Sequence, residues 1–170
     1  MSITMHSASV PVFISMLENL LVWLDKAEAH AQAKKFEPTV YLTSRLAPDM
    51  LPFTNQIQIA CDGAKFAIAR LGEVEAPKFD DAEASFADLR VRVRATTDFI
   101  ASVPASKVNG TEAKDVTIPR RAGPVVMKGE AYLKHFALPN FFFHVTTAYA
   151  LLRHNGVELG KMDYLGASKP

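Results

Sequence analysis

The sequence contains little cysteine and no clear excess of charge. Cys61 is the single cysteine among 170 residues, and 19 Lys and Arg residues stand against 18 Asp and Glu residues, for a net charge of +1. One cysteine excludes an internal disulfide and favours a reducing compartment, so we expect a cytoplasmic protein. The near-neutral charge argues against a nucleic-acid-binding protein, which needs a basic excess to release counterions.

Long hydrophobic runs are also missing. The most apolar window, residues 136–152, contains Pro139, Asn140 and His144. It is too short and too polar to cross a bilayer, which takes about 20 apolar residues. The N-terminus has no basic segment followed by an apolar run, so we expect no signal peptide. We therefore expect one soluble domain over residues 1–170, with no membrane or nucleic-acid partner.

The sequence does contain strong helical periodicity. Apolar side chains recur at three- and four-residue spacing in four segments, which predicts four helices: about 7–35, from 48–52 to 71, 81–102, and 139–154. Residues 105–128 break this pattern, and two β-prone runs around Arg120–Gly123 predict a small hairpin. The predicted fold class is all-α, a four-helix bundle with a small β-hairpin before the last helix.

Helix starts are predicted from capping residues. Asp49 is placed as the N-cap of the second helix, and Asp80 with Glu83 forms a capping-box-like start for the third. A helical turn at about 130–136 leads into the last helix. The tail after Gly156 is expected to be irregular.

Polar residues within the last helix are the first candidates for a site. His144 lies in an aromatic-rich segment, with Asn140 four residues earlier on the same face. On the second helix, Asp49 and Gln56 share one stripe. The functional interpretation is that Gln56 or Asp49 faces His144 across an interior pocket. In the structural interpretation His144 is a buried residue with a hydrogen-bond partner on another helix, Asp49 is a cap and Gln56 is exposed.

Two segments carry a family resemblance. Residues 45–71, with R-L-A-P-D-M, and residues 132–166, with L-P-N-F-F-F-H, resemble the DUF1993 family of uncharacterised bacterial proteins. The resemblance covers nearly the whole chain. That family is similar to the DinB/YfiT-like helical bundles, many of which bind a divalent metal and some of which are thiol-dependent transferases or isomerases.

The resemblance implies a weakened metal site. In that superfamily, one histidine of helix two and an H-x-x-x-H pair of the last helix hold the metal. Here Asn140 stands at the first position of the pair and His144 keeps the second, while Gln56 or Asp49 is the nearest polar substitute on helix two. Neutral amides are poor ligands for Zn²⁺ or Ni²⁺. We therefore expect a polar pocket without a three-histidine metal site, in which His144 alone matches the superfamily pattern.

Three functions stay open at this point. In the first, Asn140, His144, Gln56 and Asp49 anchor a small molecule in an apolar cavity. In the second, His144 is a ligand or general base of a metal-dependent transferase or isomerase that uses Zn or Ni. In the third, the chain is a structural or partner-binding bundle. We also expect a homodimer, because related bundles pair through helix faces and Trp23 widens the apolar arc of the first helix.

Overall fold

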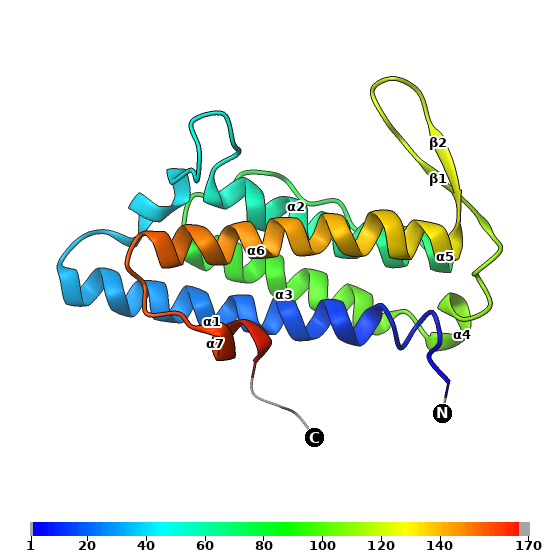
Figure 1. The fold of residues 1–170 in the computed structure, drawn as a ribbon, viewed down its shortest axis with the longest axis horizontal. Coiled ribbons are helices and arrows are strands. Elements are labelled where there is room, and N and C mark those ends of the chain that lie inside the picture. The colour runs from blue at the N-terminus through cyan, green and yellow to red at the C-terminus, as the bar shows by residue number, and fades with distance from the viewer. Residues whose placement is uncertain (1, 167–170) are drawn as a thin grey trace.

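Four long helices packed side by side form the body of the molecule, and a β-hairpin extends from one end (Figure 1). The computed structural model describes residues 2–166. The long helices are α1 (Val10–Lys34), α2 (Phe53–Gly72), α3 (Phe86–Ser102) and α6 (Leu138–His154). This is the all-α bundle, with a hairpin before the last helix, that the periodicity predicts.

Shorter elements connect the long helices. They are the 3₁₀ helix η1 (Pro38–Thr43), α4 (Ala105–Val108), α5 (Gly129–Tyr132), the π-helical turn η2 (Leu133–Ala137) and α7 (Lys161–Leu165). The hairpin consists of β1 (Asp115–Ile118) and β2 (Val125–Lys128), which pair antiparallel.

The second apolar stripe of α1 is covered by the C-terminal segment. The indole of Trp23 is fully buried, stacks on Tyr164 at 5.6 Å and donates its Nε1 hydrogen to the Asp163 carbonyl at 2.9 Å. The expectation of an irregular tail is therefore wrong for part of this segment. Residues 161–165 form α7 because the Asp163 carboxylate accepts from the Gly160 N–H and pairs with Lys26 at 2.6 Å.

The predicted N-cap of the second helix and the predicted start of the third helix are wrong. The N-cap of α2 is Pro52, and Asp49 lies exposed in the turn that precedes it. The third helix begins at Phe86, several residues later than the Asp80 start predicts, because Ser85 Oγ accepts from the Asp88 N–H at 3.1 Å. The last helix agrees better with expectation, and its preceding turn continues directly into it through η2 (Figure 1).

The hairpin returns to the bundle through a tight passage at Gly129. Its N–H donates to the Lys114 carbonyl at 2.8 Å, and a Cβ at this position would lie 2.0 Å from the Thr111 carbonyl oxygen. Only glycine fits so close to another backbone. This contact fixes where α5 leaves the hairpin, and so positions the start of the long α5–η2–α6 segment against α2.

Candidate functional site

Three positions of α2, each seven residues from the next, face the α5–η2–α6 segment. The segment runs antiparallel to α2, so successive α2 positions meet residues that lie earlier and earlier in it. The three pairs are Gln56 with His144, Gly63 with Asn140, and Arg70 with Tyr132.

The first pair is a buried hydrogen bond. Nδ1 of His144 lies 2.7 Å from Oε1 of Gln56, and the two residues are 9% and 2% exposed. Because Gln56 Nε2 donates to the Leu51 carbonyl at 2.8 Å, Oε1 is turned toward the ring and accepts from Nδ1–H. Burial lowers the pKa of His144 below its usual value. The imidazole is therefore neutral near pH 7, with a lone pair on Nε2 and no hydrogen-bond partner for it within residues 2–166.

Asn140 lines a cleft one turn away from His144. The cleft has a volume of about 190 Å³ and lies between α2, η2 and the end of β1. A Cβ on Gly63 would lie 3.4 Å from Asn140 Nδ2, so the glycine gives the amide room beside α2. Polar side chains of the cleft are Asn140, Asp62 and Arg70, and apolar walls come from Ile59, Phe66, Tyr132, Phe136 and the hairpin residues Ile118 and Pro119.

Arg70 is the cationic group of this cleft. Its Nη1 donates to the Tyr132 hydroxyl at 3.0 Å, and its guanidinium lies 5.0 Å from the ring centre of Phe66. No carboxylate within residues 2–166 forms an ion pair with it. Asp62, at the other end of the cleft, is paired with Lys65 at 2.8 Å and with Arg92 at 3.0 Å.

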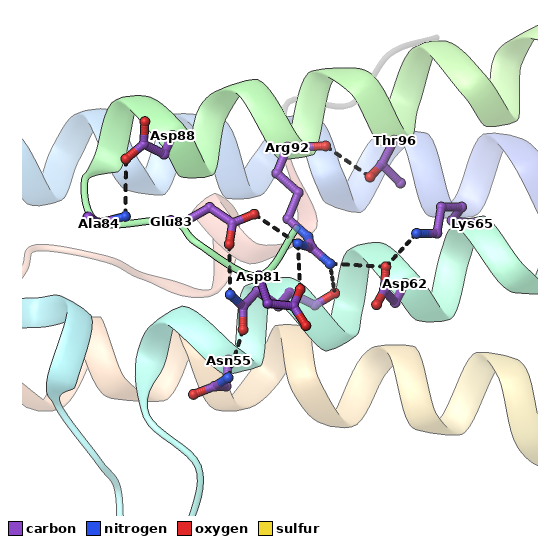
Figure 2. A network of polar contacts seen from close by, with 10 residues as sticks. Asn55, Asp62, Lys65, Asp81, Glu83, Ala84, Asp88, Arg92 and Thr96 are labelled. Carbon is purple, nitrogen blue, oxygen red and sulfur yellow. Dashed lines mark hydrogen bonds and ion pairs between the residues drawn. The ribbon is translucent and has the colours of Figure 1, made fainter. Parts of the chain in front are cut away.

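Arg92 organises a second polar cluster, between α3 and α2 (Figure 2). Its side chain is 2% exposed and pairs with Asp62, with Asp81 at 2.8 Å and with Glu83 at 2.8 Å. Burial by itself raises the pKa of Glu83, but hydrogen bonds from Arg92 and Gln58 outweigh it and hold that pKa below its usual value. The cluster fastens the segment before α3 to both α2 and α3.

Comparison with known proteins now places the chain. Residues 5–165 match the family described as "Domain of unknown function (DUF1993)". The chain belongs to the DUF1993 family. It is also similar to the crystal structure of a DinB family member protein from Shewanella denitrificans, with a TM-score of 0.90 and 40% identity over 97% of this chain and 93% of the other. This likeness confirms the DinB-like bundle. No curated protein matches the chain.

The predicted site residues of this DUF1993 protein fall into three places. Gln56 and His144 are brought together in the seam, and the buried His144 has a hydrogen-bond partner on another helix, as the structural interpretation expects; neither residue lines the cleft. Asn140 lies one helical turn from His144 and lines the cleft. Asp49 lies in the exposed turn at residues 47–50, where its carboxylate makes no hydrogen bond or ion pair with the described residues. Gln56 is buried, not exposed as the structural interpretation expects.

A resident Zn²⁺ or Ni²⁺ does not fit these donors. Within residues 2–166 no three His, Cys, Asp or Glu side chains lie where they could hold a metal ion together. The α2–α6 seam offers one imidazole, from His144, and the amides of Asn140 and Gln56. The Gln56 oxygen already accepts from His144. Such a set lacks the thiolate, carboxylate or further imidazole ligands that these metals require.

Arg70 and Arg92 are the polar residues that sequence reasoning missed. Arg70 follows Gln56 and Gly63 at the same seven-residue spacing, so extending that stripe by one heptad finds it. Arg92 lies three residues after Leu89 on the inward face of α3, which marks it as a charge on an apolar stripe.

Among residues 2–166, no helix has both the length and the apolar character needed to cross a membrane.

Proposed function

We propose that this protein binds a small organic molecule in the cleft between α2, η2 and the hairpin. The observation that carries the proposal is the composition of the cleft. Ligand sites are mostly apolar with a few polar groups that fix orientation. Here the rings of Phe66, Tyr132 and Phe136 form the walls, and Asn140 and Arg70 are the polar groups available to a ligand.

The volume limits the size of the ligand. Sites for drug-sized molecules enclose roughly 300–1,000 Å³, whereas this cleft encloses about 190 Å³. A compact molecule with a body of about one ring matches that space. Gln56 and His144 support the cleft, because their hydrogen bond fixes α6 against α2 one turn away from Asn140.

A fragment screen by protein-observed NMR tests the proposal. We expect compact ring compounds to shift the amide signals of residues that line the cleft and to raise the melting temperature, since binding to the native state stabilises it. Asn140→Leu should weaken these fragments by about tenfold, which corresponds to about 1.4 kcal/mol. Gln32→Leu, which replaces an exposed amide on α1, is the matched control and should leave binding unchanged. A screen in which no fragment shifts the cleft signals would overturn the proposal.

An enzyme is the second candidate function. His144 favours it, because a neutral imidazole held by Gln56 presents Nε2 as an acceptor for a proton, the property of a general base. A metal-dependent transferase or isomerase requires in addition that Zn²⁺ or Ni²⁺ bind with one ion per chain and that His144→Ala abolish that binding. Calorimetric titration with each metal measures both. Without metal and without a fragment in the cleft, a structural bundle is the remaining function.

Homodimerisation and a cytoplasmic location complete the proposal. The apolar arc of α1 is covered by α7, so an interface between two copies is better supported on α6, where Phe142 and Phe143 line an apolar groove with Leu46. Phe143 is 56% exposed. Light scattering of the wild type and of Phe143→Glu measures the mass in solution. The cytoplasm is supported by the single cysteine, Cys61, which is a buried free thiol.

A further inference from the structure

We propose that the ligand of this cleft is a small carboxylic acid and that Arg70 binds its carboxylate. The inference rests on the proposed function and names the chemical class of the molecule. It begins with the charge of Arg70, which lacks a counterion among the described residues although the side chain is half-buried. Its one hydrogen bond goes to a neutral acceptor, the Tyr132 hydroxyl, at 3.0 Å.

Other partly buried arginines of the chain have carboxylate partners. Arg90 of α3 pairs with Asp25 at 2.8 Å and with Glu28 at 2.6 Å, and Arg92 pairs with three carboxylates. A guanidinium has five N–H donors in a planar fork, of which Arg70 uses one. The free edge of that fork matches a carboxylate, which accepts two parallel hydrogen bonds.

The rest of the cleft adds no charge that opposes an anion. Asp62 is the carboxylate of the lining, and Lys65 and Arg92 both pair with it. Asn140 is neutral and offers an amide that donates and accepts. Arg92 also pairs with Asp81 and Glu83, whereas Asp62 is the one carboxylate partner of Lys65 among the described residues. With Asp62 paired in this way, the charge of the lining that has no ion-pair partner is the positive charge of Arg70.

A second guanidinium lies over one of the rings that line the cleft. Arg120, in the hairpin turn, is 4.7 Å from the ring centre of Phe136, which lines the cleft and stacks on Tyr132 at 5.8 Å. Arg120 is exposed and forms no ion pair within residues 2–166. Arg70 and Arg120 thus approach the same pair of stacked rings, one from α2 and the other from the hairpin, and both charges favour an anion near these rings.

The apolar walls of the cleft indicate what the rest of the ligand is. Ile59, Phe66 and Phe136 contribute apolar surface, and the volume of about 190 Å³ accepts a body near the size of one ring. The ligand class that follows is a compact aromatic or branched aliphatic monocarboxylic acid. Its apolar body contacts the rings while its carboxylate lies on the fork of Arg70.

Matched acids and amides test the inference. Sodium benzoate and isobutyrate are titrated by NMR against benzamide and isobutyramide, which have nearly the same shape without the charge. We expect the acids to bind at the cleft at least tenfold more tightly than the amides. Arg70→Gln should reduce the affinity for benzoate to that for benzamide, whereas Tyr132→Phe, which keeps the guanidinium, should retain the preference for the acid.

Two neighbouring arginines in the hairpin turn provide a matched pair of variants. Arg120→Gln should weaken benzoate binding by a few-fold, because it removes the second guanidinium beside the Phe136 ring. Arg121→Gln removes an equal charge from the next residue, which contacts no ring or carboxylate among the described residues, and should leave the affinity unchanged. Inorganic phosphate should not compete with benzoate, because it lacks the apolar body.

The outcomes separate this inference from the proposed function. Equal affinities for acids and amides in the wild type, or an Arg70→Gln variant that still prefers the acid, would overturn the carboxylate inference and leave small-molecule binding intact. Fragments that bind in the cleft while neither benzoate nor isobutyrate binds would also overturn the carboxylate inference and leave small-molecule binding intact. If neither the acids nor any fragment binds there, both proposals are wrong. The wild-type comparison of acid with amide needs no variant, so it holds even if Arg70→Gln fails to fold.

Discussion

Two arginines, Arg70 of α2 and Arg92 of α3, have opposite surroundings. Arg92 is almost fully buried among three carboxylates, and Nε is its one buried donor without a partner within residues 2–166. Arg70 is half-buried, donates to the Tyr132 hydroxyl and has no carboxylate partner in the same part of the chain. Both residues lie between packed elements, and they differ both in burial and in partners.

The comparison distinguishes a structural charge from one available for recognition. A buried charge is tolerated where opposite charges and hydrogen bonds satisfy it. A network of such pairs holds together the helices and loops that its residues come from. The Arg92 cluster meets this description, because it joins the segment before α3 to two helices. Arg70 keeps donors that the fold does not use, and these are the donors that a ligand would need.

The largest expected effect is the loss of the Arg92 cluster. Arg92→Leu leaves the nearly buried Glu83 carboxylate without its cation, and removal of one partner from a buried pair costs about 3–5 kcal/mol. Arg70→Leu removes one hydrogen bond between a charged donor and the Tyr132 hydroxyl and should cost less, about 1.5–3 kcal/mol. Denaturant unfolding of the two variants measures the difference.

The acid dependence of stability gives an independent check on the same cluster. The pKa of Glu83 is lower in the folded state than in the unfolded chain, so its stabilisation is present above the unfolded pKa and is lost as pH falls through the folded one. The wild type should lose this part of its stability below about pH 4, and Arg92→Leu should not. Equal unfolding free energies for the two arginine variants would contradict the comparison.

The Gln56–His144 pair should have a smaller effect than the Arg92 cluster. Gln56→Leu leaves a buried Nδ1–H without a partner and should cost about 1–3 kcal/mol. Burial lowers the pKa of His144, so the unfolded chain binds a proton more readily and stability falls as pH drops below about 6.5.

Unfolding at pH 5 and pH 8 measures that slope, and the part due to His144 should disappear in His144→Gln. Nitrogen-15 NMR of the imidazole identifies the protonated nitrogen directly. A ring protonated on Nε2 at pH 8 would show that Gln56 does not accept from His144, and would remove the general-base argument.

The helices could be predicted from sequence and several of their boundaries could not. The apolar repeats of α1, α2, α3 and α6 place each helix, because the buried face depends on local spacing alone. The start of α3 was predicted too early because Asp81 and Glu83, which look like first-turn acids, instead pair with Arg92. The formation of α7 depends on its contact with Trp23, which is 140 residues from Asp163 in sequence and leaves no local signal.

The candidate site was predictable to a similar extent. The approach of Gln56 to His144 follows from helical spacing together with the family pattern, and the structure brings the two together at 2.7 Å. The same spacing leads from Gln56 to Arg70, but its lack of a counterion appears only once the surrounding helices are in place. Asp49 looked equivalent on the helical stripe, yet α2 starts after Pro52 and leaves it in a turn.

The smallest expected effect is that of Gly63→Ala, which should change stability and ligand binding in opposite directions. Gly63 lies within α2, where glycine is less favourable than alanine by about 0.5–1 kcal/mol, so Gly63→Ala should raise the unfolding free energy by about that amount. The added Cβ would lie 3.4 Å from Asn140 Nδ2, an ordinary contact, but it would extend into the cleft that Gly63 lines. Fragment or benzoate binding should therefore weaken while the melting temperature rises by about 1–4 °C. Gly72→Ala, at the end of the same helix and outside this cleft, is the control for binding. A Gly63→Ala variant that binds as well as the wild type would show that the ligand does not approach α2 beside Asn140, which would leave Arg70 as the part of the cleft to examine.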